Sequence, residues 1–239
     1  MDLKIEDVAE LLNVSETTIR RWVLSGKIPA YKLNHQYRFS RNEIENWVMR
    51  CKLGQSDTQE QIYPPKIETE ESLVRPGTQQ FSLYRAIHRG GVYAHIPGKN
   101  KEEVIKEAMS RISSKLNLDA EMLTEMLLDR ERLMPTALNR GIGVPHTRDF
   151  LLRSSFDAVF VVFPETAVEY GALDCIPVHT LFFLFASADK KHLHLLAKLA
   201  HLSSSEEALA LLRSKPDLKT LLDFIRKWES SIPVRTTEP

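Results

Sequence analysis

The stretch that decides the fold of the larger part of this chain reads Asp129-Arg130-Glu131 and then Pro135-Thr136-Ala137-Leu138-Asn139-Arg140-Gly141-Ile142-Gly143-Val144-Pro145-His146. Its glycines let backbone amides approach a charged group closely, and Pro145 restricts the backbone just before His146. Histidine side chains are largely neutral near pH 7, so a ring nitrogen can act as a nucleophile. The stretch is compatible with phosphoryl transfer to His146 without a metal ion, although a Pro-His pair alone is more often part of an ordinary loop.

The residues around this stretch predict an α/β domain over 81–229, with a mixed sheet flanked by helices. An amphipathic helix is indicated by apolar residues that step by four, namely Val104, Ala108, Ile112 and Leu116. Asp119 is placed to cap a second helix that runs to Arg130. Residues 158–163 and 180–186 are continuously apolar, as interior strands are. The remaining helices are expected from Asp189 onward, near 205–213 and near 217–228.

Several separated motifs of this domain resemble one known family. They are the run from Asp129 to His146, then Pro164-Glu165-Thr166, Asp174-Cys175-Ile176-Pro177-Val178 and Lys191-His192-Leu193-His194-Leu195-Leu196. In order and spacing they are similar to the fructose/mannitol-type enzyme IIA domains (EIIA type 2) of the bacterial sugar phosphotransferase system. That group includes the nitrogen-regulatory, PtsN-like branch. The resemblance extends from Phe81 to Trp228.

The resemblance implies a role for individual residues. His146 corresponds to the phosphorylated histidine, and His192 corresponds to the second histidine of the site, which orients the phosphoryl group. Arg130 corresponds to an arginine that neutralises phosphoryl charge, a role that suits its planar fork of donors. Thr136 and Gly141 occupy loop positions where a hydroxyl or a backbone amide could reach phosphate oxygens. No cofactor and no metal ion are expected.

The turn before His146 departs from the family's pattern. The common Gly-x-Gly-x-Gly occurs here with Ala137 and Asn139 in place of the first two glycines, and Met134-Pro135 stands where Gly-Ser is common. Asparagine tolerates a left-handed backbone, so Asn139 is a mild change, whereas Ala137 is harder to explain. These changes bear on the turn geometry and on the surface where a donor would dock. They leave the acceptor in place.

Residues 1–53 predict a separate small unit of three helices and a hairpin. The helices are marked by apolar residues at helical spacing: Ile5, Val8, Leu11 and Leu12; Ile19, Trp22 and Val23; and Ile44, Trp47 and Val48. Ser15 is placed to cap the second helix, and Ser40 with Glu43 forms a capping-box pair for the third. The hairpin is expected to turn at Asn34-His35.

This small unit resembles the excisionase-type winged helix-turn-helix family. The resemblance rests on Ile5-Glu6-Asp7-Val8-Ala9-Glu10-Leu11-Leu12-Asn13-Val14-Ser15, Thr18-Ile19-Arg20-Arg21-Trp22, Gly26-Lys27-Ile28-Pro29-Ala30 and Arg38-Phe39. In such a module the second helix can enter the major groove, and arginines can address base edges. The expected DNA contacts are Thr17, Thr18, Arg20 and Arg21 on the second helix, and Lys32 and Arg38 on the hairpin.

Charge and composition set limits on these interpretations. The whole chain has no formal net charge, but from Glu16 to Arg41 one acidic residue stands against six basic ones. This local excess favours a DNA surface, while a solvated face or a protein-docking module remain the alternatives. Residues 54–80 are polar and contain prolines, which predicts a linker, and 230–239 are expected to form a tail. The two cysteines are far apart and no apolar run has the length of a membrane span, so a cytoplasmic protein without membrane insertion is expected.

These features together predict a DNA-binding transcriptional regulator controlled by phosphoryl transfer to His146. By resemblance, the donor would be the histidine phosphocarrier protein HPr or its nitrogen-branch counterpart, and the chain would be a phosphohistidine carrier rather than a small-molecule enzyme. One winged helix makes few contacts, so binding to double-stranded DNA is expected to need a homodimer. The alternatives are a transport component that relays phosphate to a sugar permease, and a metallohydrolase that uses His146, His192 and His194.

Overall fold

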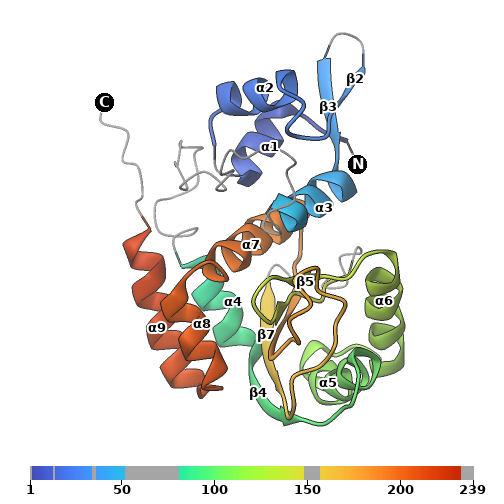
Figure 1. Cartoon of the computed structure of the whole chain (residues 1–239), viewed down its shortest axis with the longest axis vertical. Coiled ribbons are helices and arrows are strands. Elements are labelled where there is room, and N and C mark those ends of the chain that lie inside the picture. Colours follow the sequence, from blue (N-terminus) through green and yellow to red (C-terminus); the bar gives the residue numbers. More distant parts are fainter. Residues whose placement is uncertain (1, 13, 34–35, 52–80, 148–156, 233–239) are drawn as a thin grey trace. The chain divides into compact units, whose positions relative to one another are not determined.

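The computed structural model describes residues 2–12, 14–33, 36–51, 81–147 and 157–232. They form two compact units, of which the larger is Ser82–Lys227 and the smaller contains the N-terminal residues (Figure 1). The predicted linker at 54–80 and most of the predicted tail lie outside the described residues. Within the described part of the chain, every helix is too short or too polar to cross a membrane.

The smaller unit has the expected helices and hairpin. Its elements are β1 (Asp2–Leu3), α1 (Ile5–Leu12), α2 (Glu16–Leu24), β2 (Tyr31–Leu33), β3 (Gln36–Ser40) and α3 (Arg41–Cys51). The Ser15 side chain accepts a hydrogen bond from the Thr18 amide, which confirms it as the cap of α2. The strands form an antiparallel sheet in the order β1-β3-β2, with β1 as an addition to the predicted hairpin. Val8, Ile19, Phe39 and Ile44 are fully buried, so the predicted apolar stripes form the core.

The larger unit is built on the predicted mixed sheet. Its strands are β4 (Gly91–Ile96), β5 (Ala137–Leu138), β6 (Ile142–Gly143), β7 (Ala158–Pro164) and β8 (Thr180–Phe185), in the order β4-β7-β8-β6-β5. β7 and β8 pair antiparallel, whereas β4 with β7 and β6 with β8 pair parallel. Every residue of β7 and β8 is buried, as their continuously apolar sequences predict for central strands.

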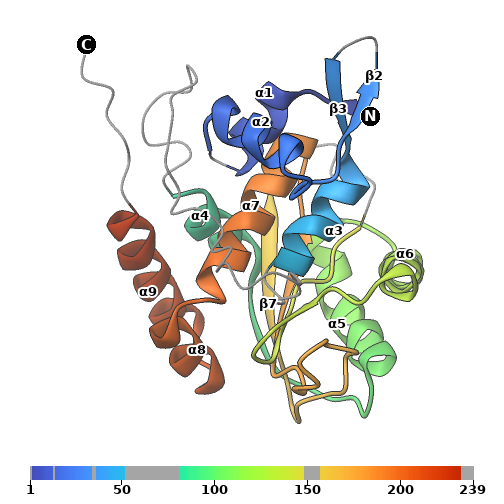
Figure 2. The ribbon, with the colours of Figure 1, turned by 45° about the horizontal axis from the view of Figure 1, so that its top comes forward.

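Helices cover both faces of this sheet. The helices of this unit are α4 (Ser82–Gly90), α5 (Lys101–Leu116), α6 (Ala120–Leu133), α7 (Asp189–Leu202), α8 (Glu206–Arg213) and α9 (Leu218–Ser231). Figure 2 shows α5 and α6 on one side of β7 and α4 and α7 on the other. The first two elements of the unit, α4 and β4, were not predicted from the sequence. Asp119 caps α6 as predicted.

Helix α6 is longer than predicted, because it ends at Leu133 rather than at Arg130. No helix-breaking residue occurs before Pro135, and the residue that precedes a proline is driven out of the helical conformation. Met134 accordingly has an extended backbone. The additional turn places Arg130 and Glu131 inside the helix, where both side chains are buried.

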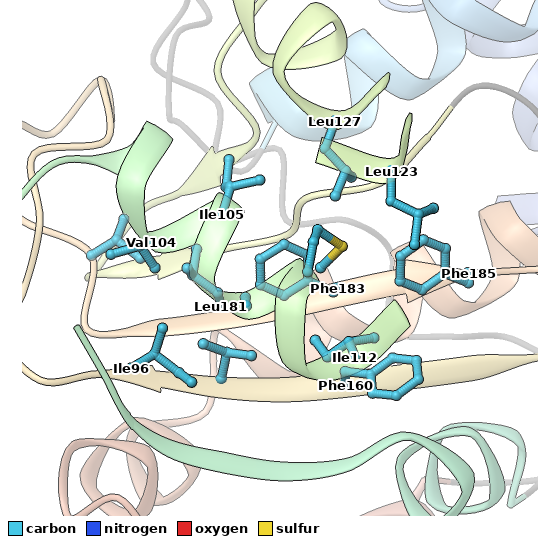
Figure 3. Packing of buried hydrophobic residues seen from close by; sticks show 14 of the residues in the cluster. Ile96, Val104, Ile105, Ile112, Leu123, Leu127, Phe160, Leu181, Phe183 and Phe185 are labelled. Carbon is cyan, nitrogen blue, oxygen red and sulfur yellow. The ribbon is translucent and has the colours of Figure 1, made fainter. Parts of the chain in front are cut away.

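The main core lies between the sheet and the pair α5 and α6. Figure 3 shows the aromatic side chains Phe160, Phe183 and Phe185 of the strands packed against aliphatic side chains of the two helices. Alternate residues of β7 and β8 point into this core, and the intervening ones are buried on the opposite face. This packing holds the sheet and the C-terminal end of α6 in place, and both carry candidate site residues.

Two leucines of α6 provide a matched test of this packing. Leu127 is fully buried in the core, whereas 64% of Leu133 is exposed. We expect Leu127→Ala to lower the free energy of unfolding by about 2–5 kcal/mol, because it leaves a cavity. Leu133→Ala should change it by only about 0.5 kcal/mol. Urea unfolding of the full chain, followed by circular dichroism, measures both, and equal losses would show that the core is misplaced.

Candidate functional site

His146 is held beside the central strand β8. After β6, the chain continues through Val144 and Pro145, and the Leu184 amide donates a hydrogen bond of 2.9 Å to the Pro145 carbonyl. His146 itself forms a parallel bridge with Leu184. The acceptor candidate therefore lies next to the end of β8, although β6 itself has only two residues.

The connection from β8 to α7 brings His192 to the same place. β8 ends at Phe185 and α7 begins at Asp189, so His192 lies in the first turn of that helix, where its amide donates to the Ala188 carbonyl at 2.9 Å. The rings of His146 and His192 have centroids 5.0 Å apart and meet edge to face at 62°. Two histidines that are far apart in the sequence thus form one pair.

A backbone contact determines which nitrogen of His146 can react. Nδ1 of His146 lies 2.8 Å from the Val144 carbonyl oxygen. A carbonyl oxygen can only accept, so Nδ1 carries the proton. The lone pair of the neutral ring is then on Nε2, and this nitrogen is the candidate nucleophile.

His194 has a different position from His192, although the two are close in sequence. Its Nε2 lies 2.9 Å from the Ser82 hydroxyl, at the start of α4. That contact gives His194 a structural role.

The last turn of α6 and the segment after it are joined by hydrogen bonds. Arg130 donates to the Met134 carbonyl at 2.9 Å. The Glu131 carboxylate accepts from the Thr136 amide at 3.0 Å and from the Thr136 hydroxyl. The Thr136 carbonyl then accepts from the Val144 amide at 2.9 Å. A continuous path of hydrogen bonds therefore runs from α6 to the residues that precede His146.

Glu131 is an ionisable group inside the protein. Burial raises the pKa of its carboxyl, while hydrogen bonds from Thr136 and electrostatic interactions with His146 and Arg130 lower it, with burial as the largest effect. Burial and the nearby carboxylate hold the pKa of the Tyr170 hydroxyl well above its usual value. The same cluster thus contains a buried carboxyl, a buried phenol and the electrostatic influence of the acceptor histidine.

The turn between β5 and β6 has its left-handed residues after Asn139. Leu138 pairs with Ile142, and the left-handed residues of the turn are Arg140 and Gly141, with φ of 72° and 81°. Asn139 does not have a left-handed backbone, so this position does not require a glycine. The Arg140 amide donates to Asp174 at 2.6 Å, which helps to stabilise this conformation.

Ala137, Gly141 and Thr136 make packing contacts or hydrogen bonds within the protein. Ala137 lies in β5 and is part of the main core, so a small apolar side chain is accommodated there. A Cβ atom on Gly141 would lie 2.5 Å from the His179 ring, so only glycine fits. Both donors of Thr136 are directed at Glu131. Contacts of Thr136 and Gly141 with phosphate therefore stay predictions.

The candidate DNA residues lie on the surface of the smaller unit. Arg20 and Arg38 line one groove, together with Lys4, Ile5, Glu6, Glu16, Gln36 and Tyr37. Arg20 pairs with Glu16 at 3.2 Å, and Arg38 donates to Gln36 at 2.7 Å. Thr17, Arg21 and Lys32 are exposed. Thr18 is half-buried and its hydroxyl lies 3.0 Å from that of Ser15, so it belongs to the helix cap.

The sequence motifs predicted no role for Glu131 or Tyr170. A signal for Glu131 exists, because it continues the buried stripe of α6 that Leu123 and Leu127 begin at spacings of four. A charged residue on the apolar face of an amphipathic helix indicates a paired or functional group. Tyr170 lies in an irregular segment, where no periodic pattern marks its burial.

Comparison with known proteins assigns each unit to a family model. Residues 87–228 match phosphoenolpyruvate-dependent sugar phosphotransferase system, EIIA 2, and residues 3–52 match a helix-turn-helix domain. A nitrogen regulatory protein of Pseudomonas aeruginosa is 30% identical over 146 residues, which cover 60% of this chain and 94% of that protein. The transcriptional repressor DcmR of Methylorubrum extorquens is 46% identical over 48 residues, covering 19% of this chain and only 18% of that protein.

A solved structure shares the fold of the larger unit. The crystal structure of nitrogen regulatory protein IIA-Ntr from Neisseria meningitidis aligns with a TM-score of 0.52 and 22% identity. The alignment covers 57% of this chain and 94% of that chain.

Tyr170 leads to a prediction about alkaline pH. The folded chain keeps the phenol protonated, so above pH 10.0 the unfolded chain releases this proton first. We expect the free energy of unfolding to fall with rising pH by about 1.4 kcal/mol per pH unit more in the wild type than in Tyr170→Phe. Urea unfolding of both chains from about pH 9 to about pH 11 measures the difference. Parallel pH profiles would show that the phenol is not buried.

Proposed function

The chain belongs to the EIIA 2 family of the phosphoenolpyruvate-dependent sugar phosphotransferase system, and from this premise we propose that it is a transcriptional regulator controlled by phosphoryl transfer to His146. A helix-turn-helix domain joined to an EIIA domain supports a regulator related to that system. The observation that carries the specific assignment is the pair of His146 and His192, whose ring centroids are 5.0 Å apart within the matched residues.

The chemistry of the proposed step follows from the position of the proton. Nε2 of His146 attacks the phosphorus of a phosphohistidine on the donor carrier protein. A new P–N bond forms as the P–N bond of the donor breaks. The donor ring, protonated on its other nitrogen, keeps the electron pair of that bond and leaves as a neutral imidazole. The proton on Nδ1 stays in its hydrogen bond to the Val144 carbonyl, which stabilises the positive charge that develops on the ring.

Two further side chains are proposed to act on the phosphoryl group. His192 would orient its oxygens, since its ring lies beside that of His146. Arg130 would neutralise its charge, because a guanidinium is always protonated and presents several donors. Arg130 and His146 both interact electrostatically with the carboxyl of Glu131, which supports a location of Arg130 near the acceptor.

The smaller unit is proposed to bind double-stranded DNA as a homodimer. The exposed Thr17, Arg20 and Arg21 lie on α2, the second helix of the helix-turn-helix domain, and Lys32 and Arg38 lie on the adjacent hairpin. The 46% identity of a 48-residue stretch of this chain to a transcriptional repressor supports the assignment. Phosphorylation would add nearly two negative charges at His146, and this charge is proposed to change DNA binding.

The alternative of a metallohydrolase has less support. It would require His194 to join His146 and His192 around one ion. The Nε2 atom of His194 instead lies within 2.9 Å of the Ser82 hydroxyl.

Phosphoryl transfer is tested with phosphoenolpyruvate, enzyme I and the histidine phosphocarrier, supplied with labelled phosphate. We expect the wild type and the exposed control His95→Ala to take up label, and His146→Ala to take up none. His192→Ala should be labelled at least about tenfold more slowly, because the phosphoryl group loses an orienting hydrogen bond. Persistent labelling of His146→Ala would remove the assignment of the acceptor.

DNA binding is tested with sequences selected from a random pool by the full chain. We expect Arg20→Ala to weaken specific binding by about 1–3 kcal/mol, and Lys32→Ala to reduce the slope of log K against log salt by about 1. Arg111→Ala, on α5 of the larger unit, is the matched control and should change neither. Sedimentation of the complex measures its stoichiometry, and unaltered binding by both variants would refute the proposed surface.

A further inference from the structure

We infer that Glu131 is a positioning residue for phosphoryl transfer, because it holds both hydrogen-bond donors of Thr136 and thereby fixes the segment that orients His146. The inference rests on the proposed function of His146. It gives a role to a buried carboxyl that would not itself contact the phosphoryl group.

The contact between Glu131 and Thr136 is strong and isolated from water. Both residues are buried, with 1% and 0% of their surfaces exposed. One carboxylate oxygen accepts from the Thr136 amide at 3.0 Å and the other accepts from its hydroxyl. Hydrogen bonds to an ionised acceptor are about twice as strong as those between neutral groups. Without Glu131, both donors would lose their acceptor inside the protein, where an unsatisfied donor is costly.

Thr136 in turn holds the backbone of the residues that precede His146. Its carbonyl accepts from the Val144 amide at 2.9 Å, and the Val144 carbonyl accepts from Nδ1 of His146 at 2.8 Å. On the other side, the Pro145 carbonyl is held by Leu184 of β8. The backbone of Val144 is therefore held by Thr136, whereas the next residue, Pro145, is held by β8. A change at Thr136 would alter the orientation of the carbonyl that selects the tautomer of His146.

A carboxyl group is an unfavourable choice if this position served packing alone. Burial raises the pKa of Glu131, so the charged form costs stability here. The charged and polar groups that face it are Thr136, His146, Arg130 and Tyr170. Leucines fill the two preceding positions of the same buried stripe, so an apolar residue would continue the pattern. The positioning role explains the carboxylate, because it accepts hydrogen bonds from the amide and the hydroxyl of Thr136 next to the reacting His146.

The first experiment measures the tautomer of His146 without any phosphorylation. Long-range proton–nitrogen NMR spectra of the labelled full chain distinguish a protonated from an unprotonated ring nitrogen, and His146→Ala assigns the signals. At a pH of about 8, where imidazoles are neutral, we expect the wild type to have its proton on Nδ1. In Glu131→Gln and Thr136→Val, a measurable fraction should shift to Nε2. Glu125→Gln, an exposed change on the same helix, is the control.

The second experiment separates docking from transfer. We expect Glu131→Gln and Thr136→Val to lower the rate of labelling at saturating donor by about tenfold, with an unchanged donor KM, because one orienting hydrogen bond is weakened. Thr136→Ser keeps both donors and should restore the wild-type rate. A melting temperature of each variant above the assay temperature excludes general unfolding as the cause of a lower rate. If Glu131→Gln does not fold, Thr136→Val tests the same hydrogen bond.

The outcomes distinguish the inference from the function on which it rests. Wild-type tautomers and wild-type rates in both Glu131→Gln and Thr136→Val would overturn the positioning role, even if His146→Ala takes up no label. Labelling of His146→Ala would overturn the proposed acceptor, whatever the tautomers show. A shift of the tautomer with a matching loss of rate, rescued in Thr136→Ser, supports the inference.

Discussion

The hydrogen bond from the Leu184 amide to the Pro145 carbonyl is the contact on which the rest of the site depends. It extends the parallel pairing of β6 and β8 by the residues that lead to His146. β8 is followed directly by α7, so this register also brings His146 to the first turn of the helix that carries His192. A different register would move His146 along β8 and separate the two rings.

The strands that provide this register are stable because they are buried on both faces. β7 and β8 are covered by α5 and α6 on one side and by α4 and α7 on the other (Figure 2). Because both faces of these strands pack against helices, a change of register would disrupt close packing on both faces. The sheet is therefore a rigid support for a site whose hydrogen bonds span several segments of the chain.

The C-terminal end of α6 carries two buried charged side chains. Arg130 and Glu131 are both buried, and both hold backbone groups of the segment that follows the helix, at Met134 and Thr136. This arrangement also accommodates the altered turn of the chain. Ala137 packs in the core, and the left-handed backbone falls on Arg140 and Gly141, so the missing glycines at 137 and 139 do not disturb the acceptor segment.

The sequence by itself determined the helices with regular apolar spacing, the two central strands, the caps at Ser15 and Asp119 and, through the motifs around His146, the family of the larger unit. These features depend on local patterns, which residues close in sequence express without their partners. Tertiary structure decided the pairing of His146 with His192, the proton on Nδ1, the backbone of Arg140 and the place of Glu131. Each of these depends on the register of β6 against β8 or on contacts after the end of α6, and the two-residue strands β5 and β6 are too short for any periodic pattern to specify that register.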